Sequence, residues 1–464
     1  MGQGRAGYAG VSFWLEDAGE PLLPRPSLEG EVEADVAVLG AGYTGLWSAY
    51  YLLRKDPSLR VVILEAEVAG FGASGRNGGW CSPNISVGPA ELVRRFGRRA
   101  ARETLLAARG AVDEVGRVAE EEGIDARFRK GGVVRVARGR HELPAVRAAW
   151  GALSALGLAD GCRVLGVEEL ARRVRVERAE GAFFDPQGAV VHPGRLVRGL
   201  ARAVERRGAV IFERSPVVDF VDGPGPVLRT AKGEVRAGAV VLAGEAYLSR
   251  LRKLHRMVLP VYSLIVLTEP LPEESWAEIG WENHECLASF KLSVDYLSRT
   301  PDGRILFGGR GAPYRFGSRI RDGYDRHEPT HAMLRESLID WFPQLSGVRF
   351  THAWGGPLGM LRDWMPAVSF DPASGVALAC GYVGQGVAAS NLAGRIIADL
   401  ILGRDSSLVR LPIVGRRVRK WEPEPLRWLG ARYVQRALER LDERGRRTGR
   451  PPTGRSLAER LSRH

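Results

Sequence analysis

The segment that most restricts the fold is a strand, a glycine turn, a helix and a second strand within residues 35–64. Residues 35–39 (DVAVL) form a short apolar run typical of a buried parallel strand. Residues 40–45 then read GAGYTG, and a helical pattern runs from Tyr43 to about Lys55. A second buried strand is expected at residues 59–64 (LRVVIL). This unit predicts an α/β fold built on a parallel sheet.

The glycine turn has the G-x-G-x-x-G spacing in the context where that spacing carries chemistry. Gly40 permits the tight turn, Gly42 lets the backbone approach a pyrophosphate, and Gly45 lets helix and strand pack closely. The helix N-terminus stabilises the anion. Glu65 ends the second strand, where it accepts a hydrogen bond from a ribose hydroxyl and disfavours a 2′-phosphate, and therefore NADP. A Rossmann-like dinucleotide site is expected, with Ala41, Tyr43, Thr44 and Ala66 as further contacts; a purely structural glycine turn is the disfavoured alternative.

A second glycine-rich loop follows a few residues beyond Glu65. Residues 70–82 read GFGASGRNGGWCS, where a plain nicotinamide enzyme continues into another crossover helix. Glycine allows positive φ and the close approach of another body to the backbone. A loop at this place lies along a pyrophosphate and reaches an isoalloxazine ring. FAD is therefore favoured over NAD, and no second dinucleotide fingerprint is found.

Here the sequence resembles the D-amino-acid-oxidase (DAO) family of FAD-dependent oxidoreductases, over almost the whole chain. Within the family, GASGRNGG most resembles the branch that includes gamma-glutamylputrescine oxidase. The resemblance implies a Rossmann-like FAD-binding domain interleaved in sequence with a mixed-sheet α+β substrate domain. It is carried by the two glycine loops and by ERSPV (213–217), VVLAGEAY (240–247), DGRILFGGR (302–310) and the span 352–399 (HAWGG…RDWMP…GYVGQGV…AGRIIAD).

The resemblance also implies which residues contact FAD. The helix that follows residues 381–387 would stabilise negative charge on the reduced flavin. Gln385 stands where the family often has His. Besides the first glycine turn, the expected contacts are Ala73, Ser74, Arg76, Asn77, Gly78, Gly79, Val217, Ala243, Gly244, Gly384, Gln385, Gly386 and Val387, with Arg76 suited to a phosphate or a ring carbonyl.

Non-covalent FAD is expected. Sarcosine-oxidase-like relatives carry a flavin-linking cysteine where this chain has Asn391, and the histidine that other relatives place in the first glycine loop is missing. Cys81, close to the second loop, is the remaining candidate for attachment. The four cysteines are otherwise expected to be buried free thiols, because they are scattered without a Cys-x-x-Cys pair, and no metal site is expected.

The activity that the resemblance implies is removal of a hydride equivalent, to the flavin N5, from the carbon bearing a neutral amine, giving an imine. His352 and Tyr296 are weak candidates for catalytic residues. Leu358 and Gly384 occupy the positions where glycine-oxidase and D-amino-acid-oxidase relatives hold a substrate α-carboxylate with arginines. This favours an amine or N-substituted amine, gamma-glutamylputrescine-like, although Arg310 or Arg362 can substitute for the lost arginines.

Three alternatives stay open. One is a D-amino acid or a glycine/sarcosine-type oxidase. Another is a dehydrogenase at a membrane surface that passes electrons to a carrier or quinone instead of oxygen. The third is a non-catalytic flavoprotein.

The charge of the chain is concentrated at its end. Of the formal net charge of +13, residues 406–464 contribute +10, from 16 Lys+Arg and 6 Asp+Glu. Without a zinc-finger or aromatic-interleaved pattern, nucleic-acid binding is not expected. The tail holds an amphipathic helix with its apolar stripe expected to dock on the chain itself, peripheral membrane contact being the alternative; the stripe is Leu426, Leu429, Tyr433, Val434, Ala437, Leu438 and Leu441.

At 464 residues the chain is expected to form two domains. The start lacks the apolar core of a signal peptide, and no run is long enough to span a membrane, so a cytoplasmic protein is expected. The expected division is an N-terminal arm (1–34), a discontinuous FAD-binding domain (35–105, 186–260 and 356–405), a substrate domain (106–185 and 261–355) and the basic tail (406–464).

Overall fold

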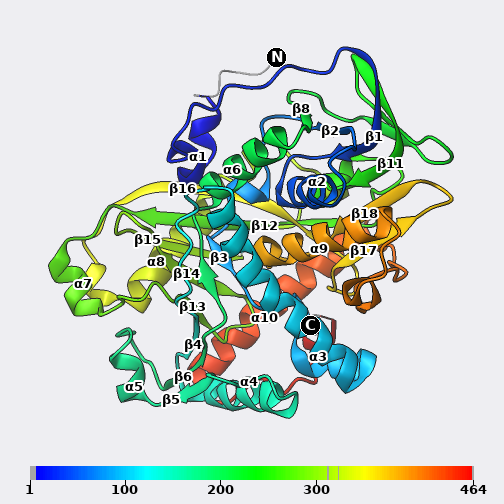
Figure 1. Cartoon of the computed structure of the whole chain (residues 1–464). Coiled ribbons are helices and arrows are strands. Elements are labelled where there is room, and N and C mark those ends of the chain that lie inside the picture. The colour runs from blue at the N-terminus through cyan, green and yellow to red at the C-terminus, as the bar shows by residue number, and fades with distance from the viewer. Residues whose placement is uncertain (1–6, 311–312, 322, 462–464) are drawn as a thin grey trace.

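The computed structural model describes residues 7–310, 313–321 and 323–461. The first six residues of the predicted arm and the last three of the tail lie outside these ranges. Two eight-stranded sheets form the framework. In Figure 1 the sheet built largely of parallel strands lies toward the right, and the mixed sheet extends toward the left. We call them the parallel sheet and the mixed sheet.

The parallel sheet contains the predicted strand–turn–helix–strand unit. β1 (Gly30–Leu39) pairs in parallel with β2 (Val61–Leu64) on one side and with β11 (Gly233–Leu242) on the other. Val36, Val38 and Ile63 are buried, which explains why these runs are apolar. In spatial order its strands are β17 (Ala367–Asp371), β18 (Val376–Cys380), β11 (Gly233–Leu242), β1 (Gly30–Leu39), β2 (Val61–Leu64) and β8 (Val210–Phe212), with β10 (Val227–Arg229) and β9 (Asp219–Val221) added beyond β11.

The mixed sheet is covered by a separate apolar core. Trp281 and Phe307 are fully buried there, together with Trp341 at the end of helix α8 (Glu328–Trp341). Its strands in order are β16 (Phe350–Met360), β12 (Leu259–Thr268), β15 (Ile305–Arg310), β14 (Asp295–Arg299), β13 (Cys286–Ser289), β4 (Val133–Ala137), β6 (Gly181–Asp185) and β5 (Arg163–Leu165); a separate pair joins β3 (Trp80–Cys81) to β7 (Ala189–Val190).

Two helices fix the position of the site because they begin at the same edge of the parallel sheet. The helix predicted from Tyr43 to about Lys55 is present as α2 (Tyr43–Lys55). α9 (Gly386–Ile401) follows the parallel strand β18 and packs on α2, where a Cβ on Gly394 would lie 2.6 Å from Trp47 Cβ. Only glycine permits this approach, which brings the two helix N-termini to one edge.

The other helices cover the sheets or join them. They are α1 (Phe13–Glu16), α3 (Pro89–Glu121), α4 (Leu143–Ala155), α5 (Val167–Ala171), α6 (Pro193–Arg206), α7 (Glu273–Ile279), α8 (Glu328–Trp341), α10 (Leu426–Thr448) and α11 (Leu457–Leu461). Short 3₁₀ turns occur at Tyr8–Val11, Ala73–Gly75, Arg140–Glu142, Glu245–Arg250, Phe316–Ser318, Pro343–Leu345 and Ser407–Arg410. All four cysteines are buried free thiols.

The predicted interleaving is confirmed, since strands of the two sheets alternate along the chain. The exact domain division stays a prediction. Its border at residue 105 falls inside α3, and its border at residue 355 falls inside β16. α3 is kinked at Gly97, where φ = 81°, and its residues on both sides of residue 105 pack on the same apolar core.

The tail helix docks with a face that is rotated from the predicted stripe. Leu426, Leu429 and Tyr433 are 60%, 52% and 48% exposed. The docked face instead includes buried Leu438 and Asp442, whose carboxylate accepts the backbone N–H groups of residues 292 and 293. The helix therefore docks partly through the polar contacts of Asp442, while part of the predicted apolar stripe stays exposed. Among the described residues, no helix is long and apolar enough to cross a membrane.

Candidate functional site

A large cavity lies where the carboxyl ends of β1, β2, β11 and β18 meet the mixed sheet. Its volume is 1140 Å³, above the roughly 300–1,000 Å³ of a typical small-ligand pocket. In open α/β sheets this edge is where ligands bind, because the loops after neighbouring parallel strands converge there. The cavity is therefore large enough for an extended cofactor together with a substrate.

The first glycine turn forms one wall. Gly40 has φ = 101°, which side-chain-bearing residues rarely adopt. A Cβ on Gly45 would lie 1.9 Å from the carbonyl oxygen of Gly40, so helix and turn are in direct contact. The N-terminus of α2 has no side-chain cap on Gly42. Its N–H groups are thus available for an anion, apart from that of Tyr43, which donates to Ser74 Oγ at 2.9 Å.

Glu65 closes the same wall at the end of β2. Its carboxylate accepts the backbone N–H of Ala41 at 2.8 Å and that of Glu67 at 3.1 Å. Burial raises the pKa of Glu65 to about 7, against those two hydrogen bonds and with a further contribution from Glu213. The carboxylate is therefore held in place, facing the cavity, before any ligand binds.

Glu65 should make the flavin-free protein less stable as pH rises. The folded-state pKa of about 7 lies above the ordinary value of 4.5, so the folded state binds the proton more tightly. Its stabilising contribution is present below pH 4.5 and falls through the window up to about 7, by at most ~3 kcal/mol. We expect the unfolding free energy of Glu65→Gln, measured by denaturant titration, to fall less than that of wild type across this window. Parallel curves would contradict the assignment.

The second glycine loop forms the next wall and is held from outside by the N-terminal segment. Ser12 Oγ donates to the carbonyl of Gly75 at 2.6 Å, and Trp14 Nε1 donates to that of Asn77 at 2.7 Å. Asn77 in turn accepts the N–H of Gly79 through its side chain. The loop is thus fixed at both faces, which suits a wall that positions a rigid ligand.

Arg76 lines the cavity but its charge is already balanced. Its guanidinium pairs with Asp325 at 3.1 Å and donates to the carbonyl of Phe71 at 2.7 Å. It also lies 4.3 Å over the Phe71 ring. The predicted contact of Arg76 with a phosphate therefore has to compete with Asp325, a partner that the sequence did not indicate.

Tyr296 projects from β14 into the space that two glycines leave. A Cβ on Gly78 would lie 2.5 Å from the Tyr296 ring, and one on Gly308 would lie 2.1 Å from it. The phenol makes a 3.0 Å hydrogen bond with Ser263 Oγ. Burial raises the pKa of Tyr296 to about 12, so the group is a neutral hydroxyl at the cavity wall.

The loop before α9 is held by Glu245. This residue has φ = 48°, and its buried carboxylate accepts the N–H groups of Gly381 at 3.0 Å, Tyr382 at 3.2 Å and also Gly359. Tyr382 further bonds to Thr44 Oγ1 at 3.0 Å. The N-terminus of α9 has no side-chain cap on Gln385 and opens on the cavity. Two uncapped helix N-termini therefore face the same space.

Most of the predicted site residues are brought together. Ala41, Gly45 and Gly79 do not line the cavity but support residues that do. Those that line it are Gly40, Gly42, Tyr43, Thr44, Glu65, Ala66, Ala73, Ser74, Arg76, Asn77, Gly78, Val217, Ala243, Gly244, Tyr296, Arg310, Leu358, Gly384, Gln385, Gly386 and Val387.

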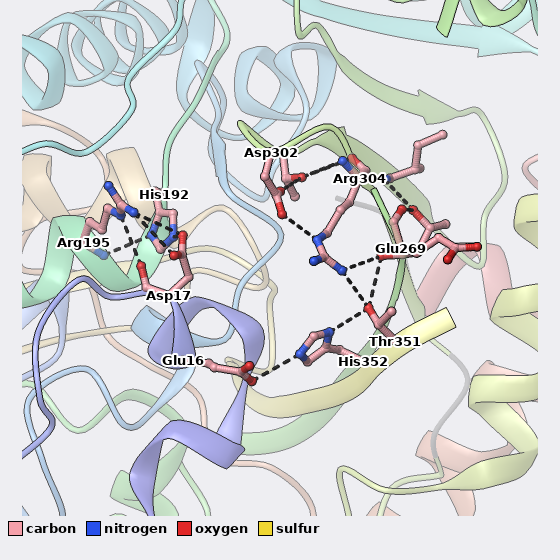
Figure 2. A network of polar contacts seen from close by, with 12 residues as sticks. Glu16, Asp17, His192, Arg195, Glu269, Asp302, Arg304, Thr351 and His352 are labelled. Atoms are coloured by element: carbon pink, nitrogen blue, oxygen red, sulfur yellow. Dashed lines mark hydrogen bonds and ion pairs between the residues drawn. The ribbon is translucent and has the colours of Figure 1, made fainter. Parts of the chain in front are cut away.

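His352 lies away from the cavity, contrary to its selection as a catalytic candidate. Figure 2 shows its imidazole between Thr351, at 2.8 Å, and Glu16 of the N-terminal helix, at 3.2 Å. The first residue of β16 that lines the cavity is Gly356, four residues or about 14 Å further along an extended strand. His352 is close to the Trp354-Gly355-Gly356 motif in sequence but not in space, because each residue of an extended strand adds more than about 3 Å.

Of the two arginines proposed to replace the lost pair, only Arg310 lines the cavity. Its guanidinium donates to the carbonyl of Val383 at 3.3 Å, and burial lowers its pKa to about 10. Arg362 is not in the wall. It pairs with Glu422 of the tail at 3.0 Å and lies over Trp421, a pairing between distant segments that local sequence does not indicate.

Sequence reasoning missed several residues of the wall. Glu245 lies within the segment VVLAGEAY, and an acid directly after a buried strand and a glycine could have indicated a site residue. No sequence pattern indicated Asp325. Arg135 stood within the predicted strand GGVVRVA, where a lone cation among apolar residues was the signal.

Residues 35–400 match the family described as FAD dependent oxidoreductase, DAO. Gamma-glutamylputrescine oxidoreductase of Escherichia coli is 32% identical over 400 residues, covering 85% of this chain and 89% of that protein. A Haemophilus influenzae protein named "Probable oxidoreductase OrdL" is 31% identical over 390 residues, covering 82% and 86%.

A solved structure agrees in fold. The crystal structure of glycine oxidase from Geobacillus kaustophilus superposes with a TM-score of 0.66 at 22% identity, covering 83% of this chain and all of that chain. The fold and the cavity define a flavoprotein oxidoreductase. The chain belongs to the DAO family of FAD-dependent oxidoreductases, whose members act on the C–N bonds of amines and amino acids.

Proposed function

We propose that the chain oxidises the C–N bond of an amine or N-substituted amine, gamma-glutamylputrescine-like, to an imine. The observation that carries this is the wall around Leu358 and Gly384. Both line the cavity side by side, since a Cβ on Gly384 would lie 3.8 Å from Leu358 Cδ1. An isobutyl group beside a glycine offers a carboxylate no side-chain hydrogen bond, whereas it accommodates the carbon chain of an amine.

The residues present fit FAD. Glu65 would accept from a ribose hydroxyl, the uncapped N-terminus of α2 would hold the pyrophosphate, and that of α9 would face the ring system. When bound, FAD supplies the two-electron acceptor for amine oxidation. The protein's part is to bind, orient and shield the substrate.

We further propose that FAD is held without a covalent bond. Among the residues that the structure describes, neither a cysteine nor a histidine lines the cavity. Cys81, the remaining candidate, is fully buried, and burial raises the pKa of its thiol far above neutrality. A buried protonated thiol is a poor nucleophile for attachment to a flavin.

Arg310 and Tyr296 supply polar contacts at the cavity wall. The buried Arg310 guanidinium disfavours a second positive charge nearby, so an amine beside it binds preferentially in the neutral form that oxidation requires. Tyr296 and Ser263 present hydroxyls that can donate to that amine. Arg310 also supports the competing interpretation, a D-amino acid or glycine-type substrate, because it can bind an α-carboxylate.

Anaerobic reduction of the purified flavoprotein separates these substrates. The long-wavelength flavin band is followed after addition of gamma-glutamylputrescine, putrescine, sarcosine, glycine and a set of D-amino acids. We expect bleaching by the acylated diamine and none by D-amino acids or glycine. Preferential reduction by D-amino acids would reject the proposal, and a protein that takes up no FAD would reject the flavin site itself.

A dehydrogenase that passes electrons to a carrier is a second candidate. It is favoured by the exposed Leu426, Leu429 and Tyr433 on the arginine-rich helix α10, which suit a membrane surface. Turnover that is slow with oxygen, rapid with an artificial acceptor and stimulated by anionic vesicles would support it. Rapid turnover with oxygen alone would reject it.

A further inference from the structure

The cavity extends well beyond the glycine loops, across the mixed sheet. In this distal part Arg135 of β4 is paired in register with Ala288 of β13 and with Phe183 of β6, and all three line the wall. α4 contributes Ala149 and Leu153. Apart from Arg135, the side chains just named are apolar. Asp185, Ser289, Lys291 and Asp295 also line this part of the cavity, so Arg135 stands in a wall that is partly apolar and partly polar.

Arg135 has no carboxylate partner among the described residues. Its guanidinium lies 4.1 Å over the Phe290 ring and makes no hydrogen bond or ion pair within that part of the chain. Arg76 and Lys291, also in the cavity wall, face Asp325 at 3.1 Å and Asp295 at 3.8 Å. The free guanidinium of Arg135 thus remains available to an anion, which it binds through two parallel hydrogen bonds when the anion is a carboxylate.

The two acids nearest in charge to Arg135 make no hydrogen bond or ion pair with it among the described residues, although Asp295 Oδ2 is buried without a hydrogen-bond partner. Burial lowers the pKa of Arg135, opposed by the charges of Glu142 and Asp295. The Glu142 carboxylate accepts the backbone N–H groups of Arg138 at 2.9 Å and Phe290 at 3.4 Å. Asp295 accepts the N–H and the hydroxyl of Ser289. Both acids keep the guanidinium charged without occupying it.

The spacing matches an elongated substrate. β4 lies two strands from β14, which carries Tyr296, and three from β15, which carries Arg310. At about 4.8 Å between strands these separations are about 10 and 14 Å. In an extended gamma-glutamyl diamine, nine bonds join the carbon to be oxidised to the carboxyl carbon, a span of about 11 Å at roughly 1.25 Å per bond.

We infer that Arg135 binds a carboxylate at the distal end of the substrate, so that the preferred substrates are ω-amines whose far end carries a carboxylate. This rests on the proposed function, because it assigns the reacting amine to the end near Tyr296. It also explains how a site without an arginine at position 358 can still select an acidic amine. The carboxylate is recognised far from the reacting carbon rather than next to it.

Calorimetry with a ligand that lacks the ω-amine tests the site without oxidation at that end. The FAD-loaded protein is titrated with gamma-glutamylbutylamine and with its α-methyl ester, which lacks only the carboxylate charge. We expect wild type to bind the acid about 30-fold more tightly than the ester. Arg135→Gln should weaken the acid about 30-fold and leave the ester within about 2-fold. Arg135→Lys should fall between them, because lysine cannot form the paired bonds.

Arg163→Gln is the matched control, because it removes the same charge from the exposed strand β5 of the same sheet. It should bind both ligands as wild type does. The inference is overturned if wild type binds neither ligand, binds acid and ester equally, or if Arg135→Gln binds the acid normally. If Arg135→Gln loses its flavin, the inference is tested by the ratio of the acid and ester affinities in wild type and in Arg135→Lys. A protein that binds the acid but is not reduced by gamma-glutamylputrescine would retain this inference and reject the proposed reaction.

Discussion

Gly45→Ala is expected to yield a protein that is purified without flavin. A Cβ at this position would lie 1.9 Å from the carbonyl oxygen of Gly40 and 3.0 Å from Val38 Cγ1. Neither can move without displacing the turn from the strand it follows, since Gly40 already has φ = 101°. The α2 N-terminus would shift relative to Glu65, and these are the two groups proposed to hold the pyrophosphate and the ribose. We expect FAD affinity to fall at least ~100-fold, about 2.7 kcal/mol.

The measurement is the flavin absorbance relative to that of the protein after purification, followed by titration of the flavin-free protein with FAD. Gly110→Ala is the matched control. It is also a glycine in a helix, but a Cβ there meets nothing within 4 Å. That change should keep the flavin and stabilise the protein by up to about 1 kcal/mol. Normal FAD affinity in Gly45→Ala would mean that the close contact of helix and turn is not required.

The cavity wall formed by the two glycine loops was predictable because its signals are local. The helix α2 begins after a glycine turn and ends before Asp56-Pro57, so residues next to each end indicate where the helix starts and stops. The second loop was predictable for the same reason. Once the strands are parallel, the loops after them converge at one edge, so residues from four separate segments could be assigned to one site from the sequence.

The substrate side was not predictable in this way, because it depends on register across the mixed sheet. Tyr296 fills the gap over Gly78 only because β14 pairs with Gly308 opposite it. Arg135 joins the cavity through pairings with β13 and β6, from segments some 150 and 50 residues away in sequence. His352 and Arg362 are close to motif residues in sequence, but they do not line the cavity. Their side chains pair instead with Glu16 and Glu422, which are distant in sequence.

Glu245→Ala is expected to destabilise the protein by about 3–5 kcal/mol and to lower its flavin content sharply. The change leaves the N–H groups of Gly359, Gly381 and Tyr382 without the buried carboxylate that they share. Each unsatisfied buried donor costs about 1–3 kcal/mol. Glu245→Gln should be milder, because its carbonyl still accepts while its amide group faces donors. Denaturant unfolding and flavin absorbance measure the two effects.

Glu234→Ala separates this effect from the loss of a carboxylate as such. Glu234 lies on β11, the strand that precedes Glu245, but its ion pairs with Arg229 and Arg236 are near the surface, so its loss should cost less than about 1 kcal/mol. If Glu245→Ala is as stable as Glu234→Ala, the segments around Gly359 and Gly381 keep their conformation without the Glu245 carboxylate. The expected difference would instead mean that one carboxylate, placed at φ = 48° after β11, fixes both the loop before α9 and the end of β16. The flavin side and the substrate side of the cavity would then be positioned by a single residue.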